Sequence, residues 1–481
     1  MLKTFPMGGI HPPENKLSAS APIEILPPPA TVTIPLSQHI GAPAVAEVAK
    51  GDKVVVGQLI ARAGGFVSST IHSPVSGTVS AVEAVTNGSG CKVMAVIISV
   101  EGDEWAPTID RSPTLVTECA LSPSEVVARI AEAGVVGMGG ATFPTQVKLS
   151  PPAGKRAETL IINGVECEPY LTADHRVMLE RGPEVIVGVG LMAYALGVEK
   201  IYIGIENNKP DAIANLRRVV GEFKGGFLNQ LPAIEIVPLK VMYPQGSEKQ
   251  LIRALTGREV PSCALPIDTG CVVQNVGTAL AVYEAVQKRK PLIERVVTVT
   301  GRGLARPSNF LARVGTPIST LIAAAGGIKT DKTGSNENPQ PTEYMKIIGG
   351  GPMMGRALSN PDTSVTKGTS GVVVMSPRES VRPPETDCIK CARCVTACPM
   401  GLEPYLLSRL TQKQLWPELE AGVVVDCISC GSCAFICPSH IPLLDWIRLG
   451  KGEVNKIIRA RTAPPSPATP SPAATSTPAA K

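Results

Sequence analysis

The order of apolar and polar positions changes along the chain and predicts successive domains of different fold. Residues 30–105 contain short apolar runs separated by Gly, Pro and Ser, notably in residues 51–60 and 71–79. Short runs that are interrupted by turn residues are typical of β-strands in an all-β domain. We therefore expect a small all-β domain at 30–105, preceded by an N-terminal extension at 1–29.

Residues 120–290 alternate between strand and helix patterns. The sequence Ser-Pro-Ser-Glu at 122–125 is a capping box with Pro at the first helical position, and it predicts a helix that ends near Gly134. Alternating elements favour an α/β domain with a parallel sheet, whose ligand sites lie at the carboxyl ends of the strands. We expect strands at 159–162, 200–205 and 234–241 and helices at 211–223 and 247–255.

The last third of the chain divides into further segments. We expect a small α+β domain at 295–375, a linker at 378–387, a cysteine-rich domain at 388–447 and a basic helix at 448–462. Residues 441–461 mix apolar with basic positions, which suits either a membrane-surface or partner-docking helix or a helix packed on the cysteine-rich domain. Residues 463–480 are all Ala, Pro, Ser or Thr, so we expect a disordered tail at 463–481.

The composition of the chain limits the number of domains and the classes of function that are possible. A chain of 481 residues with 44% apolar residues is long enough for three or four domains. The net charge of +5 comes without a basic stripe interleaved with aromatics, which argues against nucleic acid as the partner. The longest apolar run, 185–198, is shorter than the roughly 20 residues that span a bilayer, so we expect a buried helix there. The start of the chain lacks the apolar core of a signal peptide.

Eight of the 13 cysteines form two tracts with the same spacing. We call residues 388–398 the first tract and residues 427–437 the second tract. Each reads C-x2-C-x2-C-x3-C-P, in which three cysteines hold one 4Fe–4S cluster and the fourth reaches the other cluster. The first cluster is expected on Cys388, Cys391, Cys394 and Cys437, and the second on Cys427, Cys430, Cys433 and Cys398.

Zinc is the alternative metal for cysteine tracts. Structural zinc sites usually combine two C-x2-C pairs across a longer loop, so the repeated four-cysteine run favours iron–sulfur clusters. The other cysteines show no ligand spacing, and we expect them to be buried, unreactive thiols. They are Cys91, Cys119, Cys167, Cys263 and Cys271.

Four polar or glycine-rich runs in the α/β region are each weak signals of a cofactor site. The run at 137–148 is rich in glycine, whose backbone approaches a phosphate closely, and ends in Lys148. The run at 163–170 carries two carboxylates after a strand, although a solvated acidic loop would show the same pattern. The third run, at 243–249, opens a helix, and the fourth, at 273–278, places amides before an apolar helix.

In this order, the four runs resemble the NADH-binding flavoprotein subunit of respiratory complex I. The resemblance implies FMN contacts at Gly137, Gly139, Lys148, Asn163, Gly246, Gln274, Asn275 and Thr278. It implies that Phe143, Glu166, Glu168 and Glu248 lie near the nicotinamide nucleotide. Three residues depart from the family pattern: Val165, Ser247 and Gln274. We expect FMN binding to survive these changes, and we expect any loss to fall on the affinity for the nucleotide.

Two flanking regions also resemble known domains. Residues 30–105 are similar to the barrel-sandwich hybrid of lipoyl and biotinyl carriers, but Phe66 stands where those domains carry the attachment lysine. We therefore expect no attached lipoyl or biotin and a structural or docking role for this domain. Residues 296–350 resemble the β-grasp ligand-binding domain that follows the flavin domain in the complex I subunit.

About residues 5–450 resemble the RnfC family, whose members are subunits of the Rnf (Rsx) electron-transport complex. The resemblance is carried by the motifs at 8–13, 34–43 and 65–68 and by the domain order. The resemblance implies an oxidoreductase subunit that exchanges hydride between NAD(H) and non-covalent FMN and relays single electrons through two 4Fe–4S clusters. It implies a peripheral position on the cytoplasmic face of the bacterial inner membrane. The implied partners are other subunits of an ion-translocating complex, including a further ferredoxin-like subunit, and indirectly soluble ferredoxin or flavodoxin.

Two other functions stay open at this point. A flavin and iron–sulfur cobalamin reductase has similar parts, but its flavin motif lies close to its N-terminus, whereas here the all-β region precedes Gly137. A non-catalytic iron–sulfur relay adaptor is compatible with the changes at Val165 and Ser247.

Overall fold

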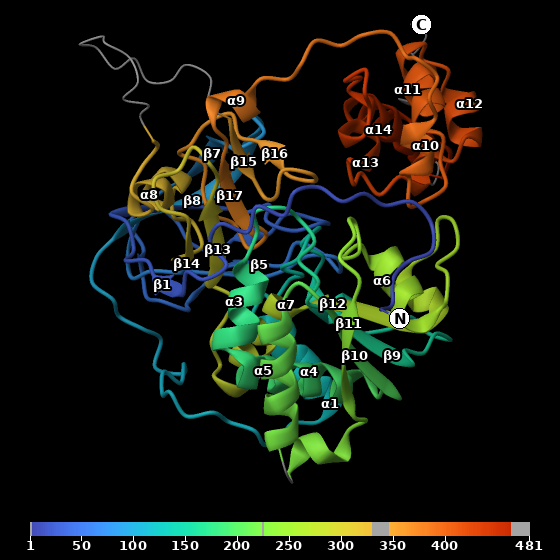
Figure 1. Cartoon of the computed structure of the whole chain (residues 1–481). Coiled ribbons are helices and arrows are strands. Elements are labelled where there is room, and N and C mark those ends of the chain that lie inside the picture. The colour runs from blue at the N-terminus through green and yellow to red at the C-terminus, as the bar shows by residue number, and fades with distance from the viewer. Residues whose placement is uncertain (1, 224–225, 330–345, 463–481) are drawn as a thin grey trace, which may run out of the picture.

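The computed structural model describes residues 2–223, 226–329 and 346–462. The expected disordered tail at 463–481 lies outside the described residues, as does the segment 330–345 of the expected α+β domain. Figure 1 shows the N-terminal β domain and the α+β domain close together, the α/β domain below them, and the C-terminal helices at one side.

The α/β domain is built on a four-stranded sheet in which all neighbouring strands are parallel, in the order β11-β10-β9-β12. Three of the strands confirm the sequence prediction. The fourth, β12, was not predicted, because its last two residues are polar amides. The strands are β9 (Thr159–Asn163), β10 (Lys200–Glu206), β11 (Ile234–Leu239) and β12 (Cys271–Asn275).

Helices cover both faces of this sheet. The predicted capping box at Ser122 is formed, and Gly134 follows the first helix with a φ of 64°. The apolar run at 185–198 lies almost entirely in the buried helix α4, as predicted. The helices are α1 (Pro123–Glu132), α2 (Thr145–Lys148), α3 (Ala173–Glu180), α4 (Gly182–Leu196), α5 (Pro210–Glu222), α6 (Glu248–Thr256) and α7 (Val276–Gln287), with short 3-10 helices η1 (Phe227–Gln230) and η2 (Pro266–Thr269).

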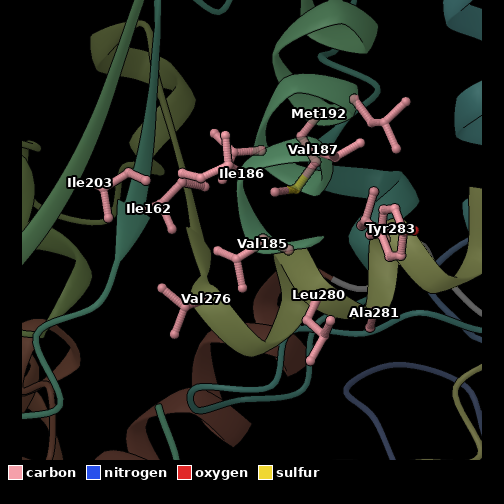
Figure 2. Packing of buried hydrophobic residues seen from close by; sticks show 14 of the residues in the cluster. Ile162, Val185, Ile186, Val187, Met192, Ile203, Val276, Leu280, Ala281 and Tyr283 are labelled. Carbon is pink, nitrogen blue, oxygen red and sulfur yellow. The ribbon is translucent and has the colours of Figure 1, made fainter. Parts of the chain in front are cut away.

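The main core lies between the sheet and the pair α4 and α7. Figure 2 shows Ile162 and Ile203 of the sheet facing Val185 and Ile186 of α4. A Cβ at Gly188 would lie 1.9 Å from the Ala279 carbonyl oxygen, so this glycine lets the two helices pack in close contact. This packing fixes the amino end of α7 against the carboxyl ends of the strands.

The N-terminal β domain consists of two antiparallel sheets around one apolar core. Phe66 lies between β5 and β6 and is 80% exposed, at the tip where carrier domains hold their lysine. The first sheet contains β2 (Thr31–Pro35), β8 (Lys92–Val100), β7 (Gly77–Thr86) and β4 (Lys53–Val54), and the second contains β3 (Val45–Ala46), β5 (Leu59–Arg62) and β6 (Ile71–His72).

The α+β domain has a six-stranded mixed sheet in the order β1-β14-β13-β17-β15-β16. Its edge strand β1 comes from the N-terminal extension and pairs in parallel with β14, which the sequence did not predict. The elements are β1 (Ile23–Ile25), β13 (Glu294–Thr300), β14 (Ser308–Arg313), α8 (Ile318–Ala324), β15 (Ile347–Gly349), β16 (Arg356–Ala357), β17 (Gly371–Val374) and α9 (Pro377–Ser380).

The C-terminal domain is helical. Its helices are α10 (Arg393–Thr396), α11 (Pro404–Gln412), α12 (Trp416–Ala421), α13 (Ser432–Phe435) and α14 (Leu443–Thr462), with the 3-10 helix η3 (Val424–Asp426). Residues 448–462 continue α14 without a break. Ile447, Gly450 and Val454 are buried in the domain, so this helix packs on the cysteine-rich core. Within the described residues, no helix combines the length and apolar character that crossing a bilayer requires.

Candidate functional site

The carboxyl ends of β9 and β12 bring together two of the polar runs. Asn163 and Asn275 end these strands and lie opposite each other in the parallel ladder. The Asn275 side chain caps α7, because its Oδ1 accepts a hydrogen bond from the Gly277 N–H at 2.8 Å. The Asn163 amide donates to the Gly246 carbonyl oxygen at 2.7 Å and so holds the third run against the same edge.

The glycine-rich run is folded onto these asparagines. The Gly137 N–H donates to the Phe143 carbonyl at 2.9 Å, and the Met138 N–H donates to the Thr278 hydroxyl at 2.9 Å. A Cβ at Gly139 would lie 2.7 Å from the Asn275 Nδ2, so a side chain there would displace the asparagine. A loop of this kind exposes backbone N–H groups beside a helix amino end, where an anionic phosphate is stabilised.

Lys148 and Glu248, predicted as separate contacts, form an ion pair. The Lys148 ammonium also donates to the Val273 carbonyl oxygen at 3.0 Å, so it is directed to the carboxyl end of β12. Among the described residues, the buried Gln274 Nε2 has no hydrogen-bond partner. An unpaired buried amide next to a glycine cradle and a cation suits a ligand that carries a phosphate and further acceptors. These residues therefore fit FMN.

The acidic run is engaged with the protein and is not a solvated loop. Glu166 accepts hydrogen bonds from the Asp174 N–H at 2.7 Å and the His175 N–H at 3.2 Å, at the start of α3. Burial, and next the charge of Glu166, raises the pKa of Asp174 to about 7. Glu168 accepts hydrogen bonds from the Met353 N–H at 3.0 Å and the Met354 N–H at 2.8 Å. Burial raises the pKa of Glu168.

One cavity in the C-terminal domain has walls of cysteine and apolar side chains. Its four cysteines are Cys398 of the first tract and Cys427, Cys430 and Cys433 of the second. In the described part of the chain, no three His, Cys, Asp or Glu side chains converge on a point that one metal ion would occupy. The sulfurs surround a cavity instead, and this arrangement fits a cluster of several irons.

The other predicted set is more open to solvent. Cys388 and Cys391 are exposed, whereas Cys394 and Cys437 are half-buried. Burial raises the pKa of the Cys394 thiol, and the nearby Cys437 contributes to that rise.

The prediction that the five remaining cysteines are buried is confirmed for Cys271, whereas Cys119 and Cys167 are half-buried. It is wrong for Cys91 and Cys263, which are exposed because they lie in loops outside the cores.

The second tract adjoins the flavin-site loops directly. The Tyr243 hydroxyl donates to the Cys430 carbonyl oxygen at 2.7 Å and lies 3.4 Å from Glu168 Oε1. The Gln250 amide donates to the Pro399 carbonyl oxygen at 3.1 Å. Ile10 of the N-terminal extension joins Tyr243 and Cys430 in one apolar cluster. The sequence placed Tyr243 in the third run but did not reveal its contact with Cys430, because the two residues are 187 positions apart along the chain.

Four family models match successive parts of the chain. They are the RnfC barrel sandwich hybrid domain at 3–103, the Nuo51 FMN-binding domain at 130–284, the SLBB domain at 296–357 and the 4Fe-4S dicluster domain at 387–441. Among solved structures, a chain of the NAD+-reducing NiFe hydrogenase in the H2-reduced state aligns with a TM-score of 0.49 and 19% identity over 73% of this chain and 65% of that chain.

Several curated proteins are similar over nearly the whole length. The RnfC subunit of the proton-translocating ferredoxin:NAD(+) oxidoreductase complex of Clostridium ljungdahlii is 46% identical over 87% of this chain and 86% of the relative. The Na(+)-translocating counterpart of Acetobacterium woodii is 42% identical, with 93% and 96% covered. The corresponding subunit of the ion-translocating oxidoreductase complex of Rhodobacter capsulatus is 44% identical, with 93% and 83% covered. The chain belongs to the RnfC family of subunits of the ion-translocating Rnf oxidoreductase complexes.

Proposed function

We propose that this chain exchanges electrons between NAD(H) and FMN and relays them through two 4Fe–4S clusters to other subunits of an ion-translocating ferredoxin:NAD oxidoreductase complex. When bound, FMN accepts two electrons together and releases them singly, which neither the nucleotide nor a cluster does. The observation that carries the proposal is the contact of Tyr243 with Cys430, because it joins a flavin-site loop to a cluster tract.

The FMN site is formed by eight residues from the four runs. The glycines let the backbone approach the phosphate closely, Lys148 supplies positive charge, and the amides and the hydroxyl of Thr278 fix the site's shape. The residues are Gly137, Gly139, Lys148, Asn163, Gly246, Gln274, Asn275 and Thr278.

The nicotinamide nucleotide lies against Phe143 and Glu248 at the open side of this site. Glu166 and Glu168 support this site without contacting the nucleotide through their carboxylates. Those carboxylates already accept hydrogen bonds from backbone N–H groups of α3 and of the loop at 351–354. They hold the loop at 163–170 in place. Hydride transfer needs no protein acid or base, so the residues contribute by position and by exclusion of water.

The two clusters act in a fixed order. The second cluster, on Cys427, Cys430, Cys433 and Cys398, receives electrons from the flavin side, because Tyr243 and Gln250 contact its loops. The first cluster, on Cys388, Cys391, Cys394 and Cys437, passes them to a partner, because two of its cysteines are exposed. In the ferredoxin-oxidising direction the same order runs in reverse.

The partners are the other subunits of the membrane complex, including a further ferredoxin-like subunit, with soluble ferredoxin or flavodoxin acting indirectly. We place the chain at the cytoplasmic face of the bacterial inner membrane as a peripheral subunit. The support is the similarity to relatives that are subunits of ion-translocating oxidoreductase complexes.

Cofactor analysis of the purified chain with NADH titration tests the proposal. We expect about one FMN and about eight irons per chain, bleaching of the flavin band by NADH, and then cluster reduction. A chain with full iron but no flavin, or with a flavin that NADH does not reduce, would support the relay-adaptor function instead. Faster electron delivery to a cobalamin than to the complex's own subunits would support the reductase function.

A further inference from the structure

Lys16 of the N-terminal extension is inserted into the acidic loop of the flavin domain. Its ammonium donates three hydrogen bonds, to the carbonyl oxygens of Glu166 at 2.8 Å, Glu168 at 2.9 Å and Leu171 at 2.7 Å. An ammonium has three N–H donors, so all of them are directed to this one loop. Burial lowers the pKa of Lys16, and the positive charge of Lys209 lowers it further, while Glu166 acts in the opposite direction.

The loop that Lys16 holds has a backbone that does not form readily without support. Glu166 has a φ of 48° and Tyr170 a φ of 71°, both in the left-handed region that residues with a Cβ seldom adopt. Such conformations persist only where the surroundings enforce them. Neighbours of Lys16 contribute further contacts: the Glu14 carbonyl accepts the Tyr170 N–H at 2.8 Å, and the Ser18 and Thr172 hydroxyls lie 2.7 Å apart.

The conformation of this loop determines where two expected FMN contacts lie. Within it, the Val165 N–H donates to Asn163 Oδ1 at 3.1 Å, and the Cys167 sulfur accepts the Gly246 N–H at 3.4 Å. A movement of the loop would therefore shift both Asn163 and Gly246. Lys209 supports the start of the same loop, because its ammonium donates a hydrogen bond to the Val165 carbonyl oxygen at 2.8 Å.

We propose that Lys16 is a positioning residue for the flavin and nucleotide site, so that the N-terminal extension is a working part of that site. The proposal rests on the assignment of FMN to the four runs. Lys16 touches neither cofactor nor substrate; it acts through the backbone of residues 166–171. Removing its ammonium leaves three carbonyl oxygens without their donor and frees a strained loop to relax.

The test compares Lys16→Met with Lys3→Met in the full chain. Lys3 lies in the same extension and also donates to a flavin-domain carbonyl, that of Leu255 at 3.2 Å, but it is away from the loop. We expect Lys16→Met to weaken FMN binding on the order of tenfold or more, measured by fluorescence titration of deflavinated protein. Lys3→Met is expected to bind FMN as the unchanged chain does.

A spectroscopic readout separates positioning from general destabilisation. Lys16→Met should keep its full iron content and cluster EPR signals, and Lys16→Arg, which restores positive N–H donors, should recover part of the FMN affinity. Equal FMN affinity in Lys16→Met and Lys3→Met overturns the proposal, and so does a parallel loss of flavin and iron in Lys16→Met, Lys16→Gln and Lys16→Arg, which would mark Lys16 as a folding residue. An unchanged chain that binds no FMN would instead refute the proposed function.

Discussion

The two cysteine tracts have identical spacing but different surroundings. In the second tract, Cys430 and Cys433 are only 8% exposed, and the Cys430 carbonyl oxygen accepts a hydrogen bond from Tyr243 of the flavin domain. In the first tract, Cys388 and Cys391 face solvent. Spacing alone therefore predicts two equivalent clusters, whereas the proposed function makes one of them the inner and the other the outer member of a relay. In this proposal the surroundings of each cluster's ligands, and not the cysteine spacing, decide the place of that cluster in the sequence of electron transfers.

The largest difference is expected when one cysteine is removed from each tract. Cys433→Ser removes a buried ligand, and we expect it to destabilise the contact between the C-terminal and flavin domains by about 4 kcal/mol, as loss of a structural metal site does. Cys391→Ser should lose about as much iron but leave that contact intact, because its site is exposed. Iron analysis with thermal unfolding checks both variants. Equal destabilisation by the two would contradict the inner and outer arrangement.

A smaller effect is expected at Gly8, where the N-terminal extension crosses the end of the first tract. Gly8 has a φ of 70°, and a Cβ there would lie 2.5 Å from the carbonyl carbon and oxygen of Cys398. Gly8→Ala should cost about 2 kcal/mol and displace Cys398, a predicted ligand of the second cluster.

Gly51→Ala is the matched control for this variant. Its φ is 98°, but a Cβ would meet nothing within 4 Å, so only the backbone strain is shared. We expect EPR to show an altered second-cluster signal in Gly8→Ala alone. Identical spectra in both variants would mean that the extension does not shape the cluster site.

A change of the order of 1 kcal/mol is expected for Tyr243→Phe, which removes one hydroxyl and leaves the buried Cys430 carbonyl without its donor. Because the lost hydrogen bond ends on a backbone group of the second cluster's loop, the midpoint potential of that cluster should shift while the other stays constant. Tyr170→Phe is the control, since its hydroxyl donates to Glu379 at 2.7 Å, away from both tracts. EPR-monitored redox titration distinguishes the two. A shift of both clusters, or of neither, would be evidence against the contact.

The smallest effect on either cluster is expected for Lys367→Met, at the junction of the β, α/β and α+β domains. The Lys367 ammonium donates to the Thr70 and Gly134 carbonyls, each at 2.7 Å, and burial lowers its pKa to about 7 from 10.5. Between these values the unfolded chain binds one more proton than the folded chain, so stability rises with pH from about 7 toward 10.5. Lys367→Met should lose this increase of stability with pH, while its cluster spectra stay unchanged. The increase is measured as the difference between the thermal unfolding midpoints at pH 7 and pH 9. An equal difference in Lys367→Met and in the unchanged chain would show that Lys367 is not its source.

Local signals in the sequence predicted much of the architecture. The capping box at Ser122 and the run at 185–198 led to the correct helices, because both depend on neighbouring residues alone. The strands at β9, β10 and β11 followed from apolar runs. By contrast, β12 ends in two polar amides, and β1 pairs with a strand 286 positions away, for example Ile23 with Asn309. Pairing across such a separation leaves no periodic signal in either segment.

The candidate site shows the same division. The cluster cysteines have characteristic spacing, so the sequence pointed to them directly, whereas the glycine-rich run became informative only through its order with three other runs. Tyr243 and Lys16 carry no such pattern, since a tyrosine before a turn and a lone lysine occur in any surface segment. Their roles depend on contacts with Cys430 and with the acidic loop, which only the folded chain brings together. The pairing of Lys148 with Glu248 was likewise not predicted, although both residues were named.

The order of the two clusters is most directly tested by rapid-freeze EPR after mixing NADH with the flavin-loaded chain, using Cys391→Ser and Cys433→Ser. Cys391→Ser retains the second cluster, and Cys433→Ser retains the first cluster. If the second cluster lies next to the flavin, its reduction in Cys391→Ser is as fast as the faster of the two cluster reductions in the unchanged chain. Reduction of the first cluster in Cys433→Ser is then far slower. The opposite ranking would place the first tract next to the flavin and contradict the account.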